Sequence, residues 1–245
     1  SYKPGADAVR VDAYAGLSRV SLVAAYAGDW DREGMVAVAY GQSTLGVWDL
    51  GVLAGSVRGD WVAGLTTVGS LGPVGLWAEG SLTTPQDEDP FVRAVGGGNL
   101  FFGEGTMIAL EIYYQSLGAS DPSDYLSQAS SDRYTRGEIW GMGKHYLGST
   151  LSHPLTPLVG ASLFALVNLQ DPSALVGPGL NWSVSDAVSF SAGAFVGFGE
   201  RPGEVDLAAL VISGISAQEG WGAVPVRSEF GLVPAMAHAS LVAWF

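Results

Sequence analysis

The sequence predicts an all-β protein, an antiparallel transmembrane β-barrel of about thirteen strands. Three observations lead to this expectation. Segments of about ten residues recur in which apolar residues alternate with polar or small ones, as the period-two geometry of a strand requires. No run approaches the roughly 18 to 20 uninterrupted apolar residues that a membrane helix needs. Short and long connections alternate between the segments, which is typical of a membrane barrel.

The first two strands are predicted over residues 9–15 and 20–26. Val9 and Val11 fall on one side of the first strand, while Arg10 and Asp12 fall on the other. The later strands are expected, in order, over residues 35–42, 47–57, 61–70, 74–82, 91–101, 106–115, 139–151, 155–168, 174–184, 187–199 and 234–245. Most of them are long enough to cross a bilayer when tilted.

Composition agrees with this class and excludes others. The chain has 35 glycines and only 14% charged residues, and glycine weakens helix interiors more than it weakens a β architecture. It has no cysteine, so neither a disulfide framework nor a thiolate metal site is available. The formal charge of -13 argues against nucleic acid as a partner, because phosphate binding relies on clustered Lys and Arg.

No Pro- or Ser-rich linker divides the 245 residues, so a single barrel domain, 1–245, is predicted. The short connections are 16–18, 43–45, 71–73 and 185–186, and the longer, acidic ones are 29–33, 83–90, 118–138 and 200–233. If the long loops face the exterior and the carboxy terminus faces the periplasm, Ser1 also lies outside. A barrel with both termini in the periplasm has an even number of strands. We therefore expect at least one amino-terminal strand to be missing, or to be supplied by another segment or polypeptide.

Eight charged residues are predicted to face the barrel lumen: Arg10, Asp12, Arg19, Asp49, Glu79, Arg93, Glu111 and Lys144. Such side chains are costly against lipid at mid-depth and cheap against water or one another. Three interpretations remain open. The residues form a salt-bridge lattice that stiffens the wall, they create a transverse field along a permeation path, or two carboxylates among them exchange a proton.

Many other residues on the predicted inward face are small, namely Gly51, Gly55, Gly97, Ser162, Gly177, Gly179, Ser189, Ser191, Gly193 and Gly197. Short side chains leave a lumen unfilled, whereas small sealed barrels fill it with bulky ones. This favours a water-filled channel. The alternative is that these glycines relieve strand curvature or lie opposite large rings.

The long connections carry most of the excess acid. Residues 29–33 and 87–89 bring together oxygen ligands that suit calcium, although neither segment has the spacing of a twelve-residue calcium loop. The alternative is a solvated loop, or one that divalent ions bridge to lipopolysaccharide. The connection 200–233 contains an apolar run, 205–212, and two placements for it remain open: a constriction or plug in the lumen, or a hairpin above the membrane.

His145, His153 and His238 are far apart in the sequence and have no metal-binding spacing. His145 and His238 are predicted to lie in strands, and His153 in a short turn. The sequence does not establish a catalytic triad. Aromatic residues near predicted strand ends suggest interfacial girdles. A sugar-stacking track is the alternative, and it requires several rings on one inward face.

Two segments, 111–122 and 136–148, resemble parts of a group of proteobacterial outer-membrane porin-like proteins. The ending Ala239–Phe245 resembles the terminal strand of bacterial outer-membrane barrels, in which the last aromatic residue belongs to the insertion signal. The resemblance implies a barrel in the bacterial outer membrane, with further strands at the amino terminus. The group supplies no catalytic or ligand motif.

The function expected from the sequence is a non-enzymatic, porin-like channel for passive passage of small hydrophilic solutes, with a mild cation preference. Its expected surroundings are outer-membrane lipid and lipopolysaccharide, and no cofactor or metal is expected. The first alternative is a barrel subunit that anchors or encloses partners in an envelope complex. An outer-membrane hydrolase is the third candidate. A soluble β-sandwich or propeller is the rival fold.

Overall fold

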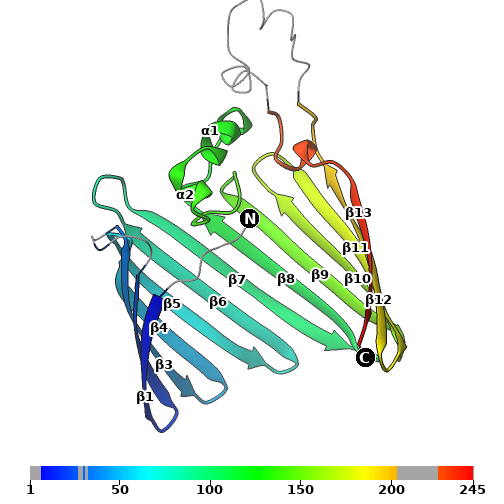
Figure 1. Cartoon of the computed structure of the whole chain (residues 1–245), viewed down its shortest axis with the longest axis horizontal. Coiled ribbons are helices and arrows are strands. Elements are labelled where there is room, and N and C mark those ends of the chain that lie inside the picture. Colours follow the sequence, from blue (N-terminus) through cyan, green and yellow to red (C-terminus); the bar gives the residue numbers. More distant parts are fainter. Residues whose placement is uncertain (1–6, 27–29, 31–32, 203–225, 245) are drawn as a thin grey trace, which may run out of the picture. The chain divides into compact units, whose positions relative to one another are not determined.

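The fold is that of a computed structural model, which describes residues 7–26, 30, 33–202 and 226–244. Thirteen antiparallel strands form one sheet, in which each strand pairs with its neighbours in the sequence (Figure 1). The predicted all-β class and the strand number are thereby confirmed. Among the described residues, no helix is long and apolar enough to cross a membrane. The chain divides into two compact units, Ser1–Gly98 and Asn99–Phe245, and the boundary falls within one strand.

The first unit contains β1 (Asp7–Ala15), β2 (Ser18–Tyr26), β3 (Met35–Leu45), β4 (Trp48–Val57), β5 (Asp60–Leu71), β6 (Val74–Thr84) and most of β7 (Phe91–Phe102). Two-residue turns close the hairpins at one end. Gly16, Gly46 and Gly72 open three of these turns with φ angles of 60°, 66° and 59°. Residues with a side chain rarely adopt this left-handed conformation, so glycine suits these positions.

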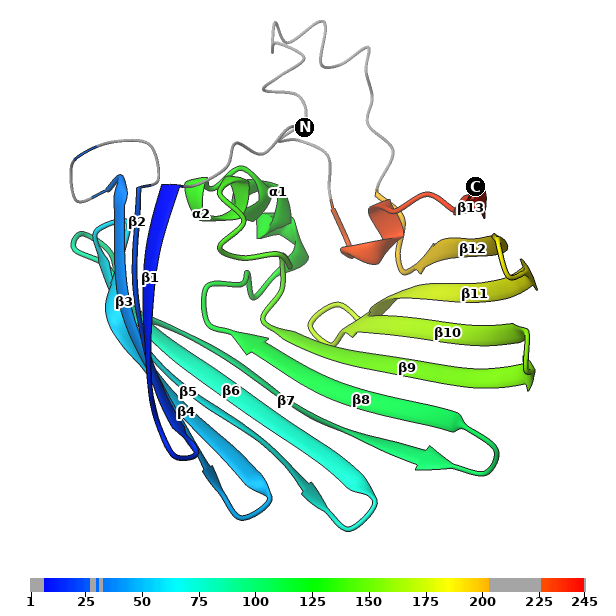
Figure 2. The ribbon, with the colours of Figure 1, turned by 60° about the horizontal axis from the view of Figure 1, so that its bottom comes forward.

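The second unit contains β8 (Thr106–Gln115), β9 (His145–Thr156), β10 (Val159–Asn168), β11 (Ser173–Ser185), β12 (Val188–Phe198) and β13 (Met236–Ala243). Short turns join its strands at one end, here called the turn end, and longer connections join them at the other, the loop end. The loop end carries η1 (Pro122–Asp124), α1 (Tyr125–Ala129), α2 (Asp132–Thr135) and η3 (Phe230–Leu232), as Figure 2 shows.

Each unit's strands have an aliphatic face and a polar face. On β8, Ile108, Leu110 and Ile112 point to the aliphatic face and are 37%, 51% and 60% exposed. Their intervening neighbours, such as Glu111 and Tyr113, point the other way, as strand geometry requires. Pairing keeps the faces aligned across strands, because Ile112 lies opposite Leu147 and Glu111 opposite Gly148. The aliphatic rows are therefore continuous from strand to strand, and no layer of the described protein covers them.

The buried apolar side chains of the described residues lie away from these rows. In the second unit they are Tyr125, Ile139, Tyr146, Val226 and Phe230, all at the loop end, and in the first unit Phe91 is buried. An ordinary soluble domain buries its aliphatic strand residues in one interior. Here the aliphatic strand residues are outside, and the closest packing involves connecting segments.

Two predicted strand boundaries in the second unit are wrong. The strand expected over 139–151 begins only at His145, because the side-chain amide of Gln115 holds the preceding segment through the carbonyl oxygens of Gly141 (2.7 Å) and Gly143 (2.8 Å). The turn expected around His153 lies at residues 157–158, and His153 is within β9. Thr156 closes this turn, since its hydroxyl accepts hydrogen bonds from the backbone N–H groups of Leu158 and Val159.

The connection predicted over 118–138 contains helices that were not expected. Ser131 caps α2 by accepting a hydrogen bond from the backbone N–H of Tyr134 (3.3 Å). The buried Arg133 then forms an ion pair with Glu138 (2.8 Å), which Arg136 also contacts. This connection is thus an ordered cap at the loop end.

Candidate permeation surface

The polar face of the first unit begins with a charged cluster on β1 and β2. Arg10 Nε lies 3.0 Å from a carboxylate oxygen of Asp12, and Arg10 Nη2 also reaches the hydroxyl of Ser21 at 3.4 Å. Ser21, which lies opposite Asp12 in the strand register, donates a short hydrogen bond to the same carboxylate. The three side chains therefore share one hydrogen-bonded network on the predicted inward face, and strand pairing explains their proximity.

A second group extends across β2 to β5. Arg19 Nη2 donates to Gln42 Oε1 at 3.2 Å, and its guanidinium lies 5.9 Å from the ring centroid of Tyr40. The Tyr40 hydroxyl is 3.4 Å from that of Thr66. A Cβ at Gly51 would overlap both Tyr40 and Thr66, so the absence of a side chain there lets the ring lie across the sheet. Gly51 therefore makes room for a large ring on the polar face. This is the second interpretation of the inward glycines, in which they lie opposite large rings.

The remaining predicted lumen residues, except Lys144, lie on strands of their own units. Asp49 accepts a 2.5 Å hydrogen bond from Thr44, and Glu79 lies opposite Thr66 in the register. The Arg93 guanidinium lies 5.7 Å from the ring of Phe91. In the second unit, Glu111 is on β8, whereas Lys144 lies just before β9 rather than within a strand. The Arg10–Asp12 ion pair and the two cation–π contacts thus belong to the first unit, and Glu111 and Lys144 to the second.

The polar face of the second unit is dominated by small residues. Gly179 lies opposite Ser162 on β10 and opposite Gly193 on β12, and Ser191 lies opposite Asn181. Four of the small residues predicted to face inward are therefore neighbours across three strands. They leave a stretch of this face without bulky side chains.

At the loop end, a buried carboxylate joins segments that are distant in the sequence. Glu229, which is 8% exposed, accepts hydrogen bonds from the Tyr146 hydroxyl (2.6 Å), the Asn168 side-chain amide (2.7 Å) and the backbone N–H of Met142 (3.1 Å). Asn168 also donates to the Tyr125 hydroxyl at 3.0 Å. We call Glu229 and these partners the Glu229 clasp. It holds α1, the segment before β9 and the segment that returns to β13 together.

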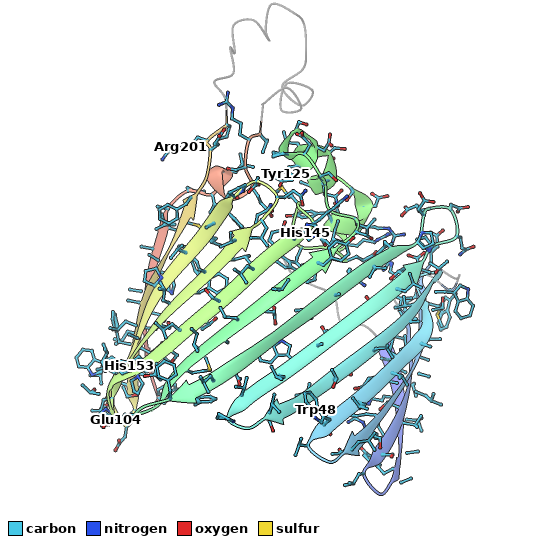
Figure 3. The ribbon with its side chains drawn as sticks, turned by 180° about the vertical axis from the view of Figure 1, so that it is seen from behind. Trp48, Glu104, Tyr125, His145, His153 and Arg201 are labelled. Atoms are coloured by element: carbon cyan, nitrogen blue, oxygen red, sulfur yellow. The ribbon has the colours of Figure 1, made fainter. Side chains whose placement is uncertain are left out.

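The clasp lies on the polar face. Its member Tyr146 pairs in register with Tyr113, on the same face as Glu111. A Cβ at Gly197, on the polar face of β12, would overlap the carbonyl oxygen of Phe230 and approach that of Val233 within 2.8 Å. The returning segment therefore packs directly on that strand. Figure 3 shows Tyr125, His145 and Arg201 at the loop end of this unit, and His153 and Glu104 at the turn end.

Opposing effects act on the pKa of Glu229. Burial is the largest and raises it, because a carboxylate loses hydration there. The donors Tyr146, Met142 and Asn168 act in the opposite direction, and the nearby Asp171 raises the value further. The net result is a pKa above that of an exposed glutamate. Burial likewise raises the pKa of the Tyr125 hydroxyl, with the charge of Asp171 as the next cause.

Sequence reasoning missed every residue of the clasp. Asn168 ends a predicted strand and Tyr146 lies within one, but neither has a local signal of burial. Glu229 falls in the predicted 200–233 connection, whose apolar run 205–212 lies outside the described residues, as do Asp29 and Asp31 of the first calcium candidate. Among the described residues, no group of three or more His, Asp or Glu side chains is arranged to hold a metal.

The three histidines lie in different settings. His145 is 3.2 Å from Gln170, His153 is 2.8 Å from the Thr106 hydroxyl, and His238 lies near Phe195. Two of them, His145 and His238, are in strands as predicted, and His153 is in β9. No protein-family model matches the chain, and the search of curated proteins found no match.

Proposed function

We propose that this protein is an outer-membrane β-barrel channel that admits small hydrophilic solutes passively. The observation that carries the proposal is the division of each strand into two faces. Val9, Val11 and Leu110 are 67%, 59% and 51% exposed, and they belong to rows that continue across neighbouring strands. Aliphatic surface of this extent is costly in water and favourable against hydrocarbon. Lipid is therefore the environment that best fits the aliphatic face.

Strand length and backbone pairing fit a bilayer as well. The strands are 8 to 13 residues long, and about 9 to 11 residues cross a hydrocarbon core when tilted. Each central strand has hydrogen-bonded neighbours on both sides, which satisfies the backbone groups that lipid cannot hydrate. At one end the connections are two or three residues long, and at the other all but the two-residue turn 58–59 are longer. This difference matches the asymmetry of bacterial outer-membrane barrels.

Passage of solutes is inferred from the polar face. Its charged residues in the first unit and its small residues in the second suit a hydrated surface, and the charged residues are costly against lipid. The Glu229 clasp holds connecting segments on the polar face, where they would narrow a passage along it. The net charge of -13 favours cations over anions near the mouth at low salt.

The topology supports a second candidate, a barrel wall that another segment or polypeptide completes. In a sheet of consecutive antiparallel strands, the first and the thirteenth have the same sense. An all-antiparallel closure therefore needs an odd number of additional strands. Every residue of β1 and every residue of β13 is exposed. A stoichiometric partner that copurifies with the chain and protects the edge of β1 from hydrogen exchange would support this candidate.

Reconstitution in planar bilayers tests the channel. We expect stepwise conductance, and a reversal potential under a KCl gradient that reports a mild preference for K⁺. A folded preparation that inserts into liposomes and shows no conductance would overturn the channel. A polypeptide that stays monodisperse in buffer without detergent would overturn the membrane assignment as well.

A further inference from the structure

A cavity of about 440 Å³ lies on the polar face of the second unit, over strands β10 to β13. Its volume falls in the range of about 300–1,000 Å³ that is usual for small-molecule sites. All of its lining residues belong to this one unit. The cavity is open on one side, so a solute that moves along the polar face has access to it.

Aromatic rings form part of its wall. Phe164, Phe195 and His238 line the cavity from three different strands. The rings of Phe195 and His238 lie 6.3 Å apart between centroids with an angle of 22° between their planes. Several rings on one inward face are the requirement for the sugar-stacking track considered from the sequence. The fold meets that requirement at this place.

Neutral polar groups point to the same space. Ser162, Asn181 and Ser191 line the cavity, and in the described part of the chain none of their side chains is hydrogen-bonded to another protein group. They offer hydroxyl groups, which donate and accept, and an amide, which does both through separate atoms. The lining contains no Lys, Arg, Asp or Glu. Apart from the titratable His238 ring, the cavity therefore has hydrogen-bonding capacity without formal charge.

Glycines keep the floor of the cavity open. A Cβ at Gly179 would lie 2.7 Å from the Ser162 hydroxyl oxygen, and one at Gly193 would lie 2.8 Å from the His238 ring. A side chain at either position would displace the groups that line the wall. An exposed glycine backbone would not by itself indicate a ligand. The ligand is indicated by the aromatic rings and the neutral polar groups that surround this backbone.

We infer that this cavity binds an uncharged, polyhydroxylated solute of the size of a mono- or disaccharide, an inference that rests on the proposed channel function. A pyranose ring presents apolar C–H groups on its faces, which pack on aromatic rings, and hydroxyl groups at its rim, which pair with Ser and Asn side chains. An anionic solute would require a permanently cationic partner, and the lining has neither Lys nor Arg. An apolar solute would leave the polar groups unpaired.

The position of the cavity fits a role in passage. Phe195 is two residues from Gly197 on the same face of β12, and Gly197 is the strand residue on which the returning segment packs. The cavity thus lies next to the Glu229 clasp, on the turn-end side. A solute that passes the clasp along this face meets the rings and hydroxyl groups next.

Calorimetric titration of the refolded full chain in detergent with maltose and with glucose tests the site, with KCl and sodium phosphate as charged comparisons. We expect saturable sugar binding, and about a three- to tenfold loss of affinity in Asn181→Ala and in Ser191→Ala, because each change removes a neutral hydrogen bond. Phe195→Leu should weaken binding as well. Ser149→Ala and Phe190→Leu, on the aliphatic face, are matched controls that should bind normally.

A smaller substitution probes the floor without removing a contact. Gly179→Ala should weaken sugar binding, whereas Gly160→Ala should not, because a Cβ at Gly160 has no atom within 4 Å. Absence of saturable binding by the wild-type chain, or equal losses in cavity and control variants, would overturn the site. Conductance without sugar binding would leave the channel standing and refute only the site. Sugar binding without conductance would leave the site standing and refute the channel.

Discussion

The hydroxyl of Tyr146 donates a 2.6 Å hydrogen bond to Oε2 of Glu229, across a separation of 83 residues in the sequence. The same hydroxyl accepts a 2.6 Å hydrogen bond from the backbone N–H of Gly143. Tyr146 therefore connects the segment before β9 to the segment that returns to β13. Because both partners are buried at the loop end, loss of this hydroxyl removes one of the donors to Glu229 and leaves the Gly143 N–H without its acceptor.

We expect Tyr146→Phe to destabilise the clasp by about 1.5–3 kcal/mol, since it removes a donor from a buried carboxylate and an acceptor from a backbone N–H. Hydrogen exchange at the amides of Met142 and Gly143 measures the effect directly. Tyr14→Phe is the control, because Tyr14 is 72% exposed and lies on β1. Unchanged protection of both amides in Tyr146→Phe would contradict the clasp.

The pH dependence of the clasp follows from the raised pKa of Glu229. A free glutamate loses its proton near about pH 4.3, whereas buried Glu229 keeps it to a higher pH. Between the pKa of a free glutamate and the raised pKa of Glu229, the clasped state therefore binds more protons than the open state. The stability of the clasp is greatest at low pH and falls as the pH rises through the raised pKa. Exchange protection of Met142, corrected for intrinsic rates, should decrease from pH 4 upward. Glu229→Gln should abolish the slope, and Glu200→Gln, at an exposed site, should keep it.

The first unit offers a test of close strand packing. A Cβ at Gly55 would overlap the backbone carbonyl of Ala37 and lie 2.7 Å from Val38 Cα, and backbone atoms cannot move away as a flexible side chain can. Gly55→Ala should therefore cost about 1–3 kcal/mol of unfolding free energy. Gly41→Ala, whose nearest contact would be an ordinary 3.6 Å, should be close to neutral. Urea unfolding of the refolded chain in detergent gives both values, and equal effects would argue against the β3–β4 approach.

The predicted lumen charges should set ion selectivity if the polar face is wetted. Glu79→Gln and Glu111→Gln should each reduce the preference for K⁺ over Cl⁻, and Arg19→Gln should increase it. Reversal potentials in bilayers report both directions. The differences in reversal potential between the variants and the wild type should shrink between 0.1 M and 1 M KCl, because the screening length falls from about 10 Å to about 3 Å. Glu104→Gln, in the short β7–β8 turn, is the control variant. If it changes the selectivity as much as Glu79→Gln does, the charges of the polar face do not set the selectivity.

Much of the sheet could be predicted without coordinates. The alternation of Val9 and Val11 with Arg10 and Asp12 is a local property, because successive side chains of a strand point to opposite faces. It predicted the strand class, the two faces and most strand positions. The turn after β9 was misplaced because Pro154 resembles a turn signal, whereas the hydroxyl of Thr156 closes the actual turn two residues later.

Local alternation determines which face a side chain takes, but it says nothing about which connecting segment returns to that face. Tyr125, Tyr146, Asn168 and Glu229 meet only because two connections, those before β9 and β13, fold onto the loop ends of β9 and β10. The cavity beside them likewise needs four strands in register before Phe164, Phe195 and His238 surround one space. Such contacts depend on chain closure over tens of residues, and tertiary packing alone decides them.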